Sequence, residues 1–83
     1  MRADICDADD PIAIEQFRAA LRCLGARVVD SDWAIGVDLY RVQIGAQEVI
    51  VYSDAYALDI EGPDDLVRRV VIEYGRRAGG GDA

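Results

Sequence analysis

The sequence predicts a two-layer α+β domain, in which a four-stranded antiparallel meander has one helix before it and one after it. This α-β-β-β-β-α order places both helices on one face of the sheet. Apolar residues recur at helical spacing near each end of the chain, whereas bulky residues between Arg27 and Glu61 alternate with a period of two. The 83 residues leave room for one hydrophobic core, so residues 1–83 are expected to form a single domain. We expect disorder in a leader over residues 1–9 and in a Gly-rich tail over residues 78–83.

The first helix is expected over residues 11–24. Asp10 is a favourable N-cap, and Pro11 suits the first helical position because its missing N–H group has no partner there in any case. Gly25 readily adopts the left-handed conformation that ends a helix. The apolar stripe of this helix consists of Ile14, Phe17, Leu21 and Leu24.

Three turns are expected to divide the central region into four strands. Residues 35–38 fit a two-residue hairpin with Gly36 at the first central position, which is typical of a type II′ turn. Residues 45–47 and 54–56 are expected to form three-residue turns. An alternative interpretation of residues 48–61 is one long bent strand, because its even-numbered residues would still share a face.

This register would gather the bulky side chains of all four strands on one face, beneath the helices. These side chains are Val29, Trp33, Ile35, Tyr40, Val42, Ile44, Ile50, Tyr52, Leu58 and Ile60. The same register would place Asp38 opposite Asp54 at one end of that face. A close pair of carboxylates could bind a cation or raise one pKa for acid–base chemistry, or the pair could contact an arginine or lie solvated at the rim.

The second helix is expected to begin at residues 62–65, where Pro63 is followed by two aspartates that favour the first helical turn. Arg76 and Arg77 suit the negative end of its dipole. Its apolar stripe consists of Leu66, Val67, Val70, Val71 and Tyr74.

The composition excludes several classes of chemistry. The chain contains no His and no Lys, and all nine of its basic residues are arginine. Without His there is no side chain that ordinarily titrates near neutral pH, and without Lys there is neither a Schiff base nor a P-loop. Cys6 and Cys23 match no zinc-binding spacing and are expected to be reduced thiols. We therefore expect a protein that is not an enzyme and that needs no cofactor or metal.

The net charge of −7 argues against nucleic acid and against an anionic membrane surface, because both attract basic patches. The chain has no run of about 20 apolar residues that could span a membrane, and no secretory signal is visible at residues 1–4. A cytoplasmic location is therefore expected.

The outer face of the sheet, turned away from the helices, is the predicted binding surface. Its centre is apolar and its edge strands carry acids, a pattern that interaction surfaces share, although acids on edge strands also prevent edge-to-edge pairing. The predicted binding residues are Asp30, Asp32, Leu39, Arg41, Val49, Val51, Asp59 and Glu61.

These observations favour a non-enzymatic acidic module that binds a basic protein surface, as an inhibitor or an immunity-type protein would. An alternative is a structural homo-oligomer that packs through the outer face. A further alternative is a metal-binding or enzymatic site built on Asp38 and Asp54.

Overall fold

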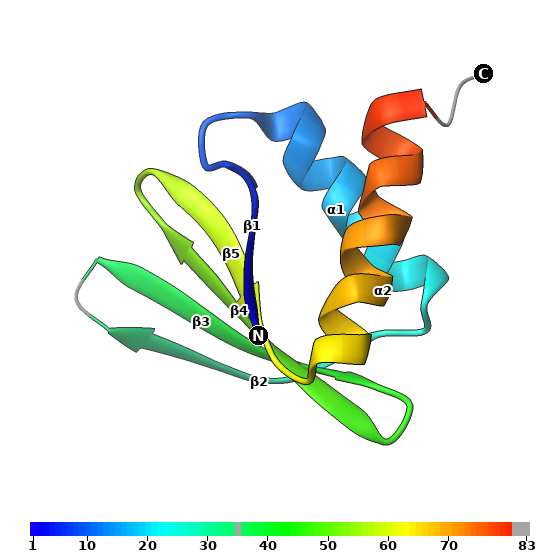
Figure 1. Ribbon diagram of the computed structural model, residues 1–83. Helices are drawn as coiled ribbons and strands as arrows, with labels where there is room; N and C mark the ends of the chain where they lie inside the picture. Colours follow the sequence, from blue (N-terminus) through cyan, green and yellow to red (C-terminus); the bar gives the residue numbers. More distant parts are fainter. Residues whose placement is uncertain (35, 81–83) are drawn as a thin grey trace.

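The computed structural model describes residues 1–34 and 36–80, which form five strands, two α-helices and one π-helical turn (Figure 1). The chain is α+β, as predicted, but its sheet has a strand more than the four that were expected. In chain order the elements are β1 (Arg2–Asp7), α1 (Pro11–Cys23), β2 (Arg27–Ala34), β3 (Val37–Ile44), β4 (Gln47–Asp54), β5 (Ala57–Glu61), α2 (Asp64–Gly75) and the π-helical turn (Arg76–Gly80).

The fifth strand, β1, occupies most of the predicted disordered leader, so that prediction is wrong for residues 2–7. β1 pairs antiparallel with β5, and the strand order is β1-β5-β4-β3-β2. Ala3 and Cys6 pack against the core from this strand. A register shift between Asp4 and Cys6 marks a β-bulge, which breaks the period-two pattern in so short a segment and hides the strand from sequence analysis.

Both predicted helices are present, with the expected end signals at α1. The Asp10 carboxylate accepts a hydrogen bond from the Ala13 N–H group at 3.0 Å, and Gly25 follows the helix with a φ of +74°. Helix α2 continues into the π-helical turn, so residues 78–80 of the predicted disordered tail have helical structure. Residues 81–83 lie outside the described part of the chain.

The first hairpin differs from the prediction by two residues in register. Ala34 pairs with Val37, and Trp33 lies opposite Asp38 instead of Tyr40. Ile35, which was expected on the bulky face, lies outside the described residues.

The second hairpin changes which side chains of β4 face the helices. Ile44 pairs with Gln47, so the connection is a two-residue turn in which Gly45 has a φ of +63°. We expected a three-residue turn, and removing one residue rotates every side chain of β4 to the opposite face. Ile50 and Tyr52 therefore lie on the outer face, and their predicted place beneath the helices is wrong.

The third connection restores the predicted orientation of β5. Ser53 pairs with Leu58, which lengthens this connection by one residue relative to the expected turn. One oxygen of the Asp54 carboxylate accepts hydrogen bonds from the N–H groups of Tyr56 at 2.7 Å and Ala57 at 2.8 Å, and this stabilises the turn. Residues 48–61 are consequently two paired strands and not one bent strand.

The core lies between helices α1 and α2 and the inner face of the sheet, defined here as the face turned toward them (Figure 1). Its buried side chains are Phe17, Val42, Ile44, Val49, Val51, Leu58, Ile60, Leu66, Val67 and Val70. The rings of Phe17 and Tyr74 join the helices in an edge-to-face contact, with centroids 6.4 Å apart.

The β2 end of the inner face is less well covered. Val28 and Trp33 lie on this face by register, yet they are 65% and 70% exposed. Val29, at the bulge of β2, is 45% exposed, so the predicted burial of β2 beneath the helices is wrong. Across the described ranges 1–34 and 36–80, no helix has the length and apolarity needed to cross a lipid bilayer.

Candidate functional site

The outer face of the sheet concentrates the negative charge of the chain. Among the described residues it carries three arginines (Arg2, Arg27 and Arg41) and eight carboxylates (Asp4, Asp7, Asp30, Asp32, Glu48, Asp54, Asp59 and Glu61). The other six of the nine arginines lie on α1, α2 and the π-helical turn. The outer face thus accounts for five of the seven net negative charges, and the helical layer is nearly balanced.

Six of the eight predicted binding residues lie on this face: Asp30, Asp32, Leu39, Arg41, Asp59 and Glu61. The other two predictions are wrong, because Val49 is fully buried and Val51 is only 4% exposed. Ile50 and Tyr52 take their place at the centre of the outer face, next to Leu39 on β3. The signal that could have found them is Gly45-Ala46 read as a two-residue turn.

Tyr52 is held by charged groups from strands β1 and β5. The Arg2 guanidinium lies over its ring, 4.3 Å from the centroid, and forms an ion pair of 3.1 Å with Asp59. The Tyr52 hydroxyl donates a hydrogen bond of 2.7 Å to the Glu61 carboxylate. This hydrogen bond is the main cause that raises the pKa of Tyr52, and partial burial adds to it. These contacts hold the Tyr52 ring in place beside two carboxylates, those of Asp59 and Glu61.

A second charged cluster lies toward the other edge of the face. Arg41 pairs with Glu48 at 3.2 Å on one side and with Asp30 at 3.6 Å on the other. The hydrogen bond to Glu48 is the main cause that raises the pKa of Arg41. These groups are exposed, so each ion pair contributes little to stability. The main effect of the cluster is to hold the Asp30 and Glu48 carboxylates in fixed positions on the outer face.

Asp30 and Asp32 have a structural role at the free edge of the sheet. The Asp30 carboxylate accepts a hydrogen bond from the Ser31 N–H group at 2.9 Å, and the Asp32 carboxylate accepts one from the Trp33 N–H group at 2.7 Å. An N–H group occupied in this way is less available to an incoming strand, and charge on an edge strand opposes pairing. These contacts support the alternative interpretation, in which both acids prevent edge-to-edge pairing of β2 with another strand.

Asp59 is the most constrained carboxylate of the face. It lies directly opposite Asp4, and like charges opposite each other destabilise a sheet. Arg2 neutralises one of its oxygens, whereas Oδ1 is buried and accepts no hydrogen bond from the described residues. Asp59 is therefore retained at a cost to stability.

The structure separates Asp38 from Asp54, contrary to the prediction. Asp38 pairs with Ser53, whereas Asp54 pairs with Val37, so the two carboxylates project from opposite faces of the sheet. The backbone hydrogen bonds from Ala57 and Tyr56 lower the pKa of Asp54, so this carboxylate stabilises a turn. Within residues 1–34 and 36–80, no group of three or more His, Cys, Asp or Glu side chains is arranged to hold a metal ion.

The two cysteines are free thiols. Burial is the main cause that raises the pKa of Cys6, and the negative charges of Asp10 and Asp7 add to it. The Cys6 thiol is therefore a poor nucleophile at neutral pH.

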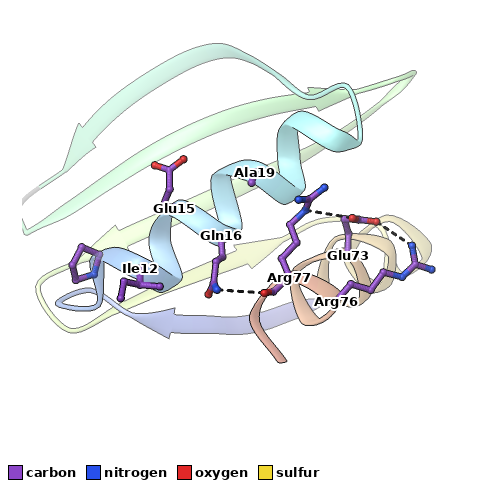
Figure 2. Close-up of a pocket in the computed structure, with 8 residues that line it drawn as sticks. Ile12, Glu15, Gln16, Ala19, Glu73, Arg76 and Arg77 are labelled. Atoms are coloured by element: carbon purple, nitrogen blue, oxygen red, sulfur yellow. Dashed lines mark hydrogen bonds and ion pairs between the residues drawn. The ribbon is translucent and has the colours of Figure 1, made fainter. Parts of the chain in front are cut away.

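A groove of about 760 Å³ lies between α1 and the C-terminal end of α2 (Figure 2). Glu73 pairs there with Arg76 at 3.3 Å and with Arg77 at 3.4 Å, and the Gln16 amide donates to the Arg77 carbonyl oxygen at 3.3 Å. Glu73 on the α2 side of the groove is thus paired with both arginines that line it.

Comparison of the chain with protein-family models, with curated proteins and with solved structures found no match.

Proposed function

We propose that this domain is a non-enzymatic protein-binding module whose outer face binds a basic protein surface. The observation that carries the proposal is the composition of that face: Leu39, Ile50 and Tyr52 at its centre, surrounded by carboxylates that account for most of the net charge. An aromatic and aliphatic centre within a charged rim is a common arrangement of binding surfaces. A role as an inhibitor or immunity-type protein, which covers a basic site on its target, fits this arrangement.

The charge of the face favours a different protein over a second copy of this chain. Two outer faces packed on each other would bring their carboxylates together, and such contacts oppose association. A basic partner would instead be attracted over a distance comparable to the Debye length, about 8 Å at physiological salt. The homo-oligomer therefore remains the less favoured alternative.

The test is crosslinked capture from the native cell with three forms of the protein. Ile50→Ser changes the centre of the outer face, and Ile72→Ser is the matched control, because Ile72 is 57% exposed on α2. We expect one or more basic proteins to be captured by the wild type and by Ile72→Ser and to be lost with Ile50→Ser. Thermal unfolding of each variant would establish that it is folded.

A second comparison tests the charge. Asp7→Lys reverses a charge on the outer face, and Asp9→Lys makes the same change outside the sheet. We expect the Asp7 variant to associate more slowly with the captured protein than the Asp9 variant, and the difference to shrink as salt rises. Equal capture by Ile50→Ser and Ile72→Ser, or a stable dimer in light scattering, would overturn the proposal.

A further inference from the structure

An apolar groove separates α1 from the part of the inner face formed by β3 and β4. Its volume is about 460 Å³, within the range of about 300–1,000 Å³ typical of small-molecule sites. Phe17 and Leu21 of α1 line one side, and Val42 and Val51 of the sheet line the other. Phe17, Val42 and Val51 also belong to the core, so the groove reaches the main apolar cluster of the domain.

Both charged side chains that line the groove are arginines, whereas the net charge of the chain is negative. Arg18 and Arg22, one helical turn apart on α1, contribute to its lining, and Ser53 contributes a hydroxyl group from β4. Arg22 forms an ion pair with Glu15 at 3.0 Å, whereas Arg18 makes no ion pair with the described residues. An exposed guanidinium beside an apolar groove can bind a carboxylate through two parallel hydrogen bonds.

The net charge of −7 limits what kind of anion could bind here. At long range the protein repels anions, so a small, fully hydrated anion gains too little from one exposed arginine. A molecule with an apolar body would gain most of its affinity from the groove and would use Arg18 to place its charged end. The apolar groove and the neighbouring Arg18 therefore favour a ligand with an apolar body and a carboxylate at one end.

We propose that this groove is a binding site for a small amphiphilic carboxylate, with its apolar body against the accessible lining residues Leu21, Val28 and Tyr40 and its carboxylate at Arg18. This site lies on the opposite face of the sheet from the proposed protein-binding surface, so the two proposals can fail independently.

The test is a titration with sodium decanoate at concentrations at which it forms no micelles, followed by ¹H–¹⁵N NMR shifts. We expect saturable shifts at the residues that line the groove. Octanoate is two methylene groups shorter than decanoate, and its affinity is expected to be lower by about fourfold for each of them. Arg18→Gln is expected to weaken decanoate binding about fivefold or more and to leave binding of neutral decanol unchanged. Arg68→Gln is the matched control, because it removes the same charge from an exposed position on α2.

A second variant tests the groove itself. Ser53→Leu adds apolar volume at the lining and is expected to abolish binding of both decanoate and decanol. Absence of saturable shifts at the groove, or equal effects of Arg18→Gln and Arg68→Gln on decanoate binding, would overturn the proposal. A dimer of the unliganded protein whose interface maps to the same residues would also overturn it, because a second copy would then occupy the groove.

Discussion

Val42 and Val49 lie directly opposite each other on β3 and β4, and their side chains are 2% and 0% exposed. This pair fixes the orientation of β4. Because neighbouring residues of a strand project to opposite faces, burial of Val49 turns Ile50 outward, and burial of Val51 turns Tyr52 outward. The binding surface proposed for this protein therefore depends on the register of one hairpin.

Substitution of adjacent residues in β4 should have unequal effects on stability. Val49→Ala removes two methyl groups from a fully buried position and is expected to cost about 2 kcal/mol of unfolding free energy. Ile50→Ala removes more apolar volume, but from a partly exposed position, and is expected to cost less than half as much. Urea denaturation of both variants is the measurement. A larger loss for Ile50→Ala would show that the register is wrong.

Gly62 should tolerate no side chain. A Cβ atom there would lie 2.9 Å from Val49 Cγ1 and 3.1 Å from the Glu48 carbonyl oxygen, so Gly62→Ala is expected to cost about 1–3 kcal/mol. Gly75→Ala is the control, because a Cβ atom at this helical position meets nothing within 4 Å. That variant should instead be stabilised by about 0.5–1 kcal/mol. Thermal unfolding would compare the two directly, and equal effects would contradict the close approach of Gly62 to β4.

Relief of the charge opposition between β1 and β5 should stabilise the protein. Asp4 faces Asp59 directly, so Asp4→Asn is expected to raise the unfolding free energy by about 0.5 kcal/mol. The gain should shrink in high salt, because salt screens charges at an exposed position. Asp9→Asn is the control, since Asp9 lies outside the sheet. Equal gains from the two variants would mean that net charge, and not the Asp4–Asp59 pair, is responsible.

The Tyr52–Glu61 hydrogen bond should be visible in an alkaline titration. Because the hydrogen bond raises the pKa of Tyr52 in the folded protein above its ordinary value of 10.0, its contribution to stability is fully present below pH 10 and is lost as the pH rises through the folded pKa. Glu61→Gln is expected to lower the pKa of Tyr52, measured by phenolate absorbance. Each titration would be repeated in a Tyr52→Phe background to identify the signal. An unchanged pKa in the Glu61 variant would contradict this contact.

The sequence was sufficient to predict the features that depend on local signals. Asp10, Pro11 and Gly25 act close to their own positions and define α1 correctly. The orientation of β5 was also predicted, but through two errors of one residue that cancelled: the turn before β4 is shorter than expected, and the turn after it is longer.

The missed features depend on turn geometry and on contacts between distant parts of the chain. Gly45-Ala46 can begin a two-residue or a three-residue connection, and pattern alone did not distinguish them, since both faces of β4 are rich in apolar residues. Strand β1 depends on pairing with β5, at least 50 positions away along the chain, and its bulge interrupts the alternation. Four of the eight outer-face acids, Asp30, Asp32, Asp59 and Glu61, were predicted because alternation along β2 and β5 was sufficient to place them.

The most direct test of the outer face is a methyl nuclear Overhauser measurement on the folded protein. We predict cross-peaks from the Val49 methyl groups to the methyl groups of α2, among them Leu66 and Val70, because these side chains share the core. The Ile50 methyl groups should give none to that helix. Cross-peaks from Ile50 to Leu66 or Val70, with none from Val49, would reverse β4 and remove the proposed binding surface.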